Sequence, residues 1–193
     1  MKLVFATNNP NKLLEVQKIL GNNFEIVTLK QIGFFDDIPE PHPTLQENAI
    51  EKAMTIYNKF GLNCFAEDTG LEVEALNGEP GVLSARYAGQ DKAADKNIAK
   101  VLANLQSKNN RNAQFRTVAA LVINGSVTTF EGIVKGKILE KPTGTGGFGY
   151  DPIFLPNGYN HSFAQMRLSI KNSISHRAIA IKKLTNHLNK LKV

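Results

Sequence analysis

The sequence predicts an α/β protein with a mixed β-sheet, and two observations carry this prediction. In the N-terminal part of the chain, short apolar runs alternate with segments whose apolar residues recur at helical spacing, as in β-α units. Near the middle, two β-rich segments, 113–123 and 126–138, flank Asn124-Gly125, a dipeptide that favours a tight hairpin. Because β-α units pair strands in parallel and a hairpin pairs them antiparallel, we expect both pairings in one sheet.

Helix caps and turn residues indicate where the elements begin and end. Pro10 suits the first position of a helix, and Gly21 suits the position just past its end. Thr44-Leu45-Gln46-Glu47 matches a capping box, and Gly61 can end the helix that it opens. In chain order we predict a strand at 2–6, a helix at 10–20, a strand at 25–29, a loop at 33–43, a helix at 45–60, strands at 64–67 and 71–76 separated by Asp68-Thr69-Gly70, a turn at 77–81, a helix from Asp91, the central hairpin, and a last helix capped by Ser175.

Length and composition bound the class of protein. At 193 residues, with 42% apolar and 21% charged residues, residues 1–193 are expected to form one soluble unit, as one large domain or two small lobes. No apolar run approaches the roughly 20 residues that span a bilayer, and the apolar start is too short for a signal peptide. The single Cys64 excludes an internal disulfide, and nothing indicates a zinc site. We therefore expect a cytoplasmic enzyme or binding protein without a membrane partner.

The net charge of +6 is unevenly distributed along the chain. No Asp or Glu follows Asp151, whereas seven Lys or Arg residues do. A basic segment can bind nucleic acid or a small polyanion, or it can be a solvated helix face. For the lysines of the last helix we favour the solvated face, because no aromatic residues are interleaved with them.

A polar segment between the first predicted strand and the first helix is a candidate phosphate-binding loop. It consists of Thr7, Asn8, Asn9, Pro10, Asn11 and Lys12. Ligands of open α/β sheets bind beyond the carboxyl ends of the strands, and the free N–H groups of a helix start attract anions. A polar loop with an N-cap is the simpler alternative, and no Walker A motif occurs in the chain.

Acidic residues at the end of a predicted apolar strand indicate a metal site. Glu67 and Asp68 stand there, and buried acids are costly unless a cation pairs with them. Oxygen ligands beside phosphates point to Mg²⁺, which typically takes one or two carboxylates plus water and substrate oxygens. Glu40, in the acidic proline-rich loop, is a candidate further ligand. The alternatives are a simple turn acid at position 68 and a surface acid at position 40.

Residues 143–154 form a glycine-rich loop that leads into aromatic residues. Glycine suits places where a chain bends sharply or passes close to a ligand. A loop that admits a phosphate or sugar, followed by Phe148 or Tyr150 as a ring that stacks on a base, would suit a nucleotide. The alternative is a tight turn with both rings in the core.

Basic residues stand just before and at the start of the last helix. Lys171, His176 and Arg177 can donate hydrogen bonds to a carbonyl oxygen on a base, and Lys171 could instead bind phosphate. The alternative is a capping Ser175 with two exposed basic neighbours. A phosphate loop, metal-binding carboxylates, a glycine-aromatic loop and a basic helix start together predict nucleoside triphosphate hydrolysis.

In this order and spacing, the motifs resemble those of the inosine/xanthosine triphosphate pyrophosphatases, almost from end to end of the chain. The motifs are Ala6-Thr7-Asn8-Asn9-Pro10-Asn11-Lys12 with Glu15, Glu47-Asn48-Ala49 through Lys52-Ala53, Glu67-Asp68-Thr69-Gly70-Leu71, Pro80-Gly81 through Ser84-Ala85-Arg86-Tyr87, Gly146-Gly147-Phe148-Gly149-Tyr150-Asp151-Pro152, and Ser175-His176-Arg177. Three positions depart from the family pattern. Asn11 stands where glycine is frequent, Glu67 where many relatives have Asp, and Ser169-Ile170 where acids commonly precede the lysine, so the sequence offers Lys171 no local partner.

The resemblance implies an elongated two-lobed α/β structure around a long mixed β-sheet with a central substrate cleft, usually as a homodimer. It implies Mg²⁺-dependent hydrolysis of ITP, dITP and XTP to the monophosphate and pyrophosphate, which cleanses the nucleotide pool. Asp68 would bind Mg²⁺ and accept the proton of the attacking water, with Glu67 and Glu40 assisting at the metal. Residues implied to bind phosphate are Thr7, Asn8, Asn9, Pro10, Asn11, Lys12, Lys52 and Thr69. Residues implied to bind the base are Phe148, Gly149, Tyr150, Asp151, Lys171, His176 and Arg177.

Base discrimination follows from hydrogen-bond chemistry. A 6-oxo purine presents an acceptor that His176 or Arg177 can satisfy, whereas the 6-amino group of adenine would leave buried donors facing each other, at a cost of about 1–3 kcal/mol. Two alternatives are a relative acting on other nucleotides, such as the Maf-type pyrimidine triphosphate pyrophosphatases, and a nucleic-acid-binding module that uses the basic C-terminal segment. The second alternative predicts steeply salt-dependent binding to DNA or RNA.

Overall fold

The computed structural model describes residues 2–21 and 24–191, which divide into two compact units. Unit 1 comprises the chain up to Asp68, Thr117–Gly132, and the chain from Arg177 onwards. Unit 2 comprises Thr69–Arg116 and Ile133–His176. Three long strands have residues in both units: β3 (Cys64–Val73), β5 (Asn112–Ile123) and β6 (Ser126–Ile138).

In unit 1, the N-terminal elements form a parallel part of the sheet. The further elements of this unit are β1 (Lys2–Phe5), α1 (Pro10–Leu20), β2 (Glu25–Thr28), the 3₁₀ helix η2 (Lys30–Ile32), α2 (Leu45–Phe60), and all but the first residue of α5 (His176–Leu191). β1 pairs in parallel with β2, Leu3 opposite Ile26, and in parallel with β3, Phe5 opposite Phe65. The carboxyl end of β1 therefore lies beside Phe65 near the start of β3, three residues before Asp68, and the candidate phosphate loop follows directly.

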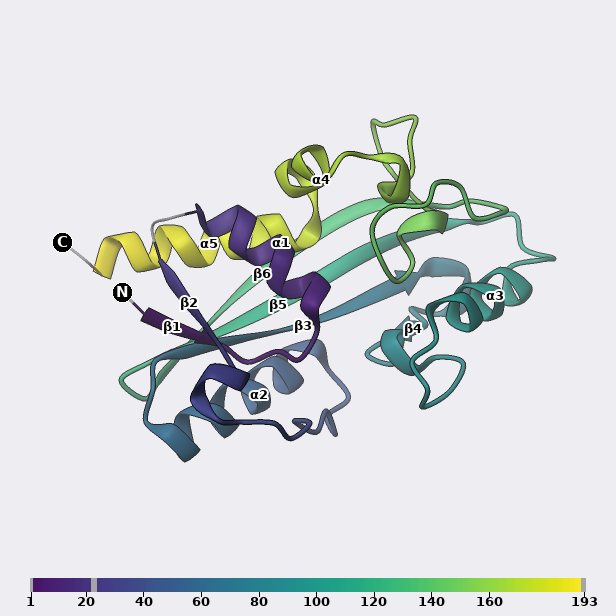
Figure 1. The fold of residues 1–193 in the computed structure, drawn as a ribbon. Coiled ribbons are helices and arrows are strands. Elements are labelled where there is room, and N and C mark those ends of the chain that lie inside the picture. The colour runs from purple at the N-terminus through teal and green to yellow at the C-terminus, as the bar shows by residue number, and fades with distance from the viewer. Residues whose placement is uncertain (1, 22–23, 192–193) are drawn as a thin grey trace. The chain divides into compact units, whose positions relative to one another are not determined.

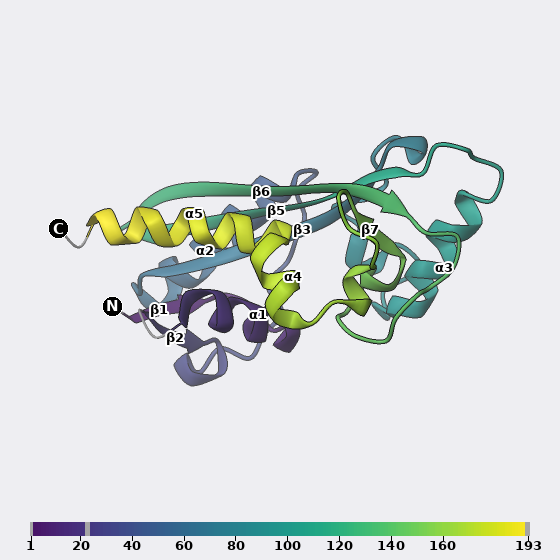
Figure 2. The ribbon, with the colours of Figure 1, turned by 90° about the horizontal axis from the view of Figure 1, so that it is seen from above.

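Helices cover both faces of the sheet in unit 1. α1 and α5 lie on one face and α2 on the other (Figure 1). The core between the sheet and helices α1 and α5 contains Phe5 and Phe65, whose ring centroids lie 4.5 Å apart. Val16 from α1 and Leu184 from α5 belong to the same core. Figure 2 shows α5 running along β6, where Lys183 donates to the Glu131 carbonyl oxygen. The apolar face of the last helix is thus core, as its spacing predicts.

In unit 2, short elements surround an aromatic core. They are η3 (Glu74–Leu76), β4 (Pro80–Gly81), η4 (Ser84–Arg86), α3 (Ala94–Asn104), η5 (Asp151–Ile153), β7 (Phe154–Pro156), η6 (Phe163–Gln165) and α4 (Leu168–Ile174). β4 pairs antiparallel with β3, and β7 pairs antiparallel with β6. The rings of Phe115, Phe154 and Phe163 pack together at the centre of this core.

The predicted α/β class and mixed sheet are confirmed. Among the described residues the strand order is β2-β1-β3-β5-β6-β7, with β4 beside β3. α1 begins at Pro10, and α2 begins after Thr44, whose hydroxyl accepts the Glu47 N–H at 3.2 Å. Asn124 and Gly125 have φ values of 48° and 83°, as a two-residue hairpin turn requires.

Three predicted boundaries are wrong. The strand predicted at 71–76 ends at Val73, where the 3₁₀ helix η3 follows. Asp68-Thr69-Gly70 does not separate two strands but lies inside the single strand β3. The polar side chain is accommodated because Asp68 is paired with Lys52, and a Cβ at Gly70 would collide with the Gly81 carbonyl of the neighbouring strand. The helix predicted from Asp91 begins only at Ala94, because Lys92 has a φ of 54° and Ala93 is extended, so neither residue is helical.

Two short elements, β7 and α4, were not predicted. Both are too short to show a periodic apolar pattern, β7 with three residues and α4 with seven. Ser175 is the C-cap of α4 and directly precedes α5. Within the described residues, we find no helix with the length and hydropathy needed to cross a membrane.

Candidate active site

The loop between β1 and α1 is tightly ordered by its own side chains. Asn9 is the N-cap of α1, and its Oδ1 accepts the N–H groups of Asn11 at 3.0 Å and Lys12 at 3.2 Å. Thr7 Oγ1 accepts the Asn9 N–H at 3.2 Å. Two N–H groups predicted to face an anion are therefore already bonded, so side chains such as the Lys12 ammonium are the stronger candidate donors to a phosphate.

A network of buried charges lies beside this loop. Arg177 is 1% exposed, and its Nε donates to both Glu67 oxygens, at 2.8 and 2.9 Å. Its Nη1 donates to Glu15 Oε2 at 2.5 Å. Lys12 Nζ lies 3.2 Å from Glu67 Oε1. The network therefore joins two cations and two carboxylates from α1, β3 and α5.

The pKa shifts in this network show which charges are held firmly. Burial alone would raise the pKa of Glu67, but Arg177 and Lys12 outweigh burial and lower it. The pKa of Arg177 is raised, because Glu67 and Glu15 outweigh the effect of burial. Burial dominates at Lys12 and lowers its pKa despite Glu67. Lys12 is thus the cation in this network with the most to gain from an added negative charge.

A second charged group surrounds Asp68, the last residue of β3 that belongs to unit 1. Lys52 Nζ, from α2, lies 2.7 Å from Glu40 Oε1 and 3.0 Å from Asp68 Oδ1. The side chains of Lys52 and Asp68 are each 8% exposed, and that of Glu40 is 24% exposed. The structure therefore brings together three of the predicted site residues around one ammonium group.

Asp68 combines burial with an oxygen atom that has no partner. Its Oδ2 is buried and, among the described residues, meets no hydrogen-bond donor. Burial raises the pKa of Asp68, although Lys52 and Lys12 oppose the shift. A buried carboxylate with an unsatisfied oxygen is suited to binding a cation or to accepting a proton.

The donor set around Asp68 fits a magnesium ion that is shared with a substrate. No cluster of three or more His, Cys, Asp or Glu side chains able to hold a metal occurs in the described part of the chain. Mg²⁺ usually binds through one or two carboxylates plus water and substrate phosphates, which matches Asp68 with Glu40. Glu67 is engaged by Arg177 and Lys12, so its predicted role at a metal stays a prediction.

In unit 2, the glycine-rich loop is held by one buried ion pair. Asp151 is 2% exposed, and its Oδ2 accepts the Phe148 N–H at 2.8 Å and the Lys171 ammonium at 2.5 Å. The ammonium also lies 4.8 Å from the centroid of the Phe148 ring. Gly147 has a φ of 70°, and a Cβ there would overlap the Asp151 carboxylate. The partner of Lys171 that the neighbouring sequence did not reveal is therefore Asp151.

The two aromatic residues of this loop differ in burial. Tyr150 is 5% exposed, and its hydroxyl donates to the Ser84 carbonyl oxygen at 2.8 Å. Phe148 is only half-buried. His176 is buried, and its ring stacks on Phe115 at 4.5 Å. The alternative of a core turn thus describes Tyr150, whereas Phe148 is partly exposed and lies beside the Lys171 ammonium.

The predicted site residues are distributed between the two units by chemical type. Those in unit 1 are Thr7, Asn8, Asn9, Pro10, Asn11, Lys12, Glu40, Lys52, Glu67, Asp68 and Arg177. Those in unit 2 are Thr69, Phe148, Gly149, Tyr150, Asp151, Lys171 and His176. That Arg177 binds the base stays a prediction; the bonds described above make it the centre of the charge network in unit 1.

The sequence motifs did not assign a role to Glu15, although it is 3% exposed and binds Arg177. Its signal was an acid directly before the buried Val16 on an amphipathic helix, since a charge at such a position requires a partner.

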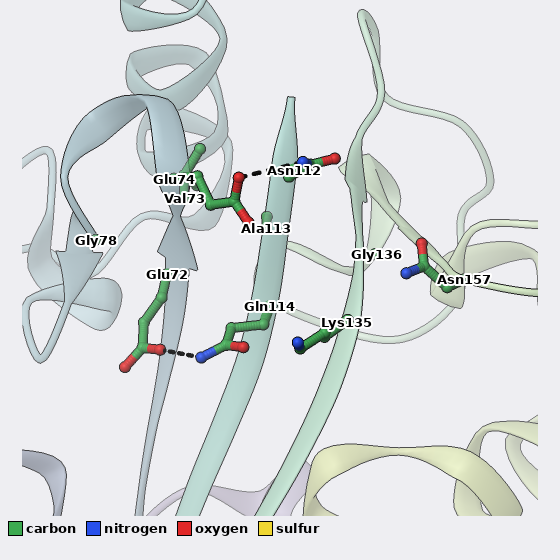
Figure 3. Close-up of a pocket in the computed structure, with 10 residues that line it drawn as sticks. All are labelled: Glu72, Val73, Glu74, Gly78, Asn112, Ala113, Gln114, Lys135, Gly136 and Asn157. Carbon is green, nitrogen blue, oxygen red and sulfur yellow. Dashed lines mark hydrogen bonds between the residues drawn. The ribbon is translucent and has the colours of Figure 1, made fainter. Parts of the chain in front are cut away.

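A hollow of about 440 Å³ in unit 2 is a second candidate site (Figure 3). Glu72 faces Gln114, and Glu74 faces Asn112. Gln114 donates to Glu72 at 2.6 Å and Asn112 to Glu74 at 3.1 Å. Because these acids are already bonded by amides and none of the predicted site residues lines the hollow, it is not assigned a catalytic role.

Comparisons with known proteins identify the class of molecule. A profile of the Ham1 family matches residues 3–187. The dITP/XTP pyrophosphatase of Flavobacterium johnsoniae is 52% identical over 192 residues, covering 100% of both chains. That of Christiangramia forsetii is 51% identical over 98% of this chain and 100% of its own. The solved structure of a HAM1 protein from Coxiella burnetii has a TM-score of 0.91 at 36% identity, covering 98% of this chain and 99% of that one.

The α/β fold and these relatives place the chain in the class of nucleoside triphosphate pyrophosphatases, which are hydrolases. The chain belongs to the Ham1 family, which confirms the resemblance found in the sequence.

Proposed function

We propose that this protein hydrolyses non-standard purine nucleoside triphosphates, dITP, XTP and ITP, to the monophosphate and pyrophosphate with Mg²⁺. The observation that carries the proposal is Asp68, whose buried Oδ2 has no partner among the described residues and whose pKa burial raises. The relatives named dITP/XTP pyrophosphatases support the two substrates in their names. ITP and the magnesium requirement rest on the sequence resemblance and on the donor set.

In this proposal, the residues of unit 1 bind the phosphates and activate water. Lys12 and Lys52 supply positive charge. Burial disfavours the charged form of Lys12 and lowers its pKa, so an anion bound beside it would stabilise the charge. Asp68 accepts a proton from water. Burial raises its pKa, which makes it a stronger base than an ordinary carboxylate. Mg²⁺, held by Asp68 and Glu40, would neutralise charge on the phosphate oxygens.

In the same proposal, the residues of unit 2 recognise the base. The half-buried Phe148 offers a ring for stacking, and Asp151 with Lys171 holds the loop that carries it. His176 donates to the 6-oxo group. Stacking is tolerant of base identity, so discrimination against adenine falls to the hydrogen-bonding residues.

The homodimer and the cytoplasmic location stay predictions from the resemblance and the composition. Light scattering coupled to gel filtration measures the mass in solution, and we expect twice the 21.2 kDa of the chain. A mass equal to that of one chain would contradict the dimer.

Product analysis tests the proposal directly. Purified protein is incubated with dITP, XTP, ITP, ATP, GTP and UTP, with and without Mg²⁺, and pyrophosphate and monophosphate are quantified. We expect Mg²⁺-dependent pyrophosphate release from the first three and little from ATP. Release of orthophosphate would contradict the site of cleavage, and turnover of ATP equal to that of dITP would contradict the recognition of the 6-oxo group.

A further inference from the structure

The segment that carries Glu40 has an unusual composition. Prolines at positions 39, 41 and 43 alternate with Glu40 and His42. Each proline fixes its own φ and pushes the residue before it toward an extended conformation. A segment of this kind is stiff, so fixing the position of His42 also fixes that of Glu40.

His42 contacts two side chains of α2, the buried Asn48, which binds its backbone, and Glu51, whose Oε2 lies 3.7 Å from His42 Nε2. The Asn48 amide is 1% exposed, and its Oδ1 accepts the His42 N–H at 2.9 Å. Its Nδ2 donates to the His42 carbonyl oxygen at 3.0 Å. One asparagine thus satisfies both backbone groups of the histidine.

Asn48 and Lys52 hold neighbouring points of the same segment. They stand four residues apart on α2, about 6 Å along the helix axis and on one face. Glu40 and His42 stand two residues apart, about 6.5 Å along an extended chain. Because the two spacings match, Asn48 can bind His42 while Lys52 binds Glu40 at 2.7 Å.

We propose that Asn48 is a positioning residue of the metal site: by binding His42 it sets the register of residues 39–43 along α2 and so places Glu40 beside Lys52 and Asp68. The inference rests on the proposed magnesium requirement. The ammonium of Lys52 contacts both carboxylates. When a phosphate or a metal ion draws Lys52 away, the Asn48 contact keeps Glu40 in place.

Unit 2 offers a matched control. Asn97 is the fourth residue of α3, as Asn48 is of α2, and it is also buried. Its Oδ1 accepts the Ala88 N–H at 2.7 Å, and its Nδ2 donates to the Ala85 carbonyl oxygen at 2.9 Å. Asn97→Ala therefore removes the same two kinds of bond from a segment that carries no predicted metal ligand.

Hydrogen exchange of the metal-free protein tests the contact itself. In Asn48→Ala we expect faster exchange at the His42 amide and unchanged exchange at Ala88. In Asn97→Ala we expect faster exchange at the Ala88 amide and unchanged exchange at the His42 amide. Unchanged exchange at His42 in Asn48→Ala would overturn the positioning role.

Metal titration tests the consequence. We expect the Mg²⁺ concentration for half-maximal activity, and the Mn²⁺ affinity measured by electron paramagnetic resonance without nucleotide, to weaken about tenfold in Asn48→Ala, since each lost hydrogen bond is worth a few-fold. Asn97→Ala should leave both unchanged. In the double variant Glu40→Gln/Asn48→Ala, the second change should add nothing, because Asn48 acts through Glu40.

The outcomes separate this inference from the proposed function. A metal-dependent wild-type protein with unchanged metal affinity in Asn48→Ala would overturn the inference alone. A wild-type protein that neither binds Mn²⁺ nor requires Mg²⁺ would overturn both. If Asn48→Ala does not fold, Asn48→Asp replaces it, since it keeps the acceptor for the His42 N–H and loses the donor to the carbonyl; a smaller weakening in the same direction is then expected.

Discussion

The two units of this protein bury polar groups in different ways. Unit 1 buries a network of acids and bases around Arg177 and a second group around Lys52. In unit 2 the site residues include the rings of Phe148, Tyr150 and His176, and the ion pair between Lys171 and Asp151 holds the loop that carries the first two. Buried charges are costly unless they are paired, and the ion pairs of unit 1 supply this compensation. Aromatic rings suit a flat, neutral ligand.

The largest effect is expected from substituting Asp68 in unit 1, which should lower the rate of the reaction without lowering the stability of the protein. Asp68→Asn should lower kcat about 10²–10⁴-fold, the usual contribution of a general base. The free energy of unfolding should be unchanged or higher, because burial already disfavours the charged form of Asp68 and raises its pKa. Initial rates and urea unfolding measure the two effects. Near-normal kcat would show that another group accepts the proton.

Breaking the charge network should cost stability. Arg177→Met removes the cation that binds both buried acids, Glu15 and Glu67, although Lys12 stays beside Glu67, and should lower the free energy of unfolding by about 3–5 kcal/mol. The control is Arg116→Met in unit 2, whose contact with Glu72 is 3.7 Å long and partly exposed and should matter by less than about 1 kcal/mol. Equal losses in both variants would contradict the distinction between the units.

The same network predicts that part of the free energy of unfolding is lost as the pH falls. Arg177 and Lys12 outweigh burial and lower the pKa of Glu67. A lowered carboxyl pKa contributes stability above the pKa of the unfolded chain, and this contribution is lost as the pH falls through the lowered value. Urea unfolding between about pH 7 and pH 3 should therefore show a smaller acid-dependent loss in Arg177→Met than in wild type. If the free energy of unfolding depends on pH identically in the two proteins, Glu67 is not the source of the acid-dependent loss.

A smaller effect should come from the aromatic loop of unit 2. Phe148→Ala should raise the KM for dITP about 5- to 150-fold, since stacking of a base on an aromatic ring is worth about 1–3 kcal/mol. The Mg²⁺ dependence should stay as in wild type. Tyr159→Ala, which removes a ring that is 41% exposed in the same unit, is the control and should leave KM unchanged. A shift in Mg²⁺ dependence in Phe148→Ala would contradict the division of roles.

The smallest effect concerns a thiol in unit 1 that takes no part in the charge network. Burial raises the pKa of Cys64 to about 12, and its Sγ lies 3.2 Å from the Ala53 carbonyl oxygen. Because the unfolded thiol ionises near pH 8.5, stability should fall slightly as the pH rises above that value. Thiol reagents at about pH 8 should label the native protein far more slowly than the unfolded one. Rapid native labelling would indicate local opening around β3.

Local features of the fold were predictable because their signals are local. Pro10, Thr44 and Asn124-Gly125 each specify backbone geometry within a few residues, and each prediction is confirmed. The predicted break in β3 was wrong because the partner that accommodates Asp68 is a lysine 16 residues earlier in the chain.

The candidate site shows the same limit. The residue types for phosphate, metal and base were recognisable as motifs, whereas the partners that hold them were not. Lys171 binds an acid 20 residues away, and Arg177 binds acids 110 and 162 residues away. Asn48 and Glu15 belong to the recognised motifs but were assigned no role from them, because their roles consist of contacts with other segments.

The sequence by itself determined the α/β class, the ends of α1 and α2, the hairpin, the family and the set of candidate site residues. All of these depend on residue type, spacing or short-range backbone preference. Only the tertiary structure decided that Arg177 pairs with Glu15 and Glu67, that Lys52 joins Glu40 to Asp68, and that Tyr150 is core while Phe148 keeps partial exposure. Burial and ion pairing depend on which distant segments meet, and charge and pKa at the site follow from that meeting.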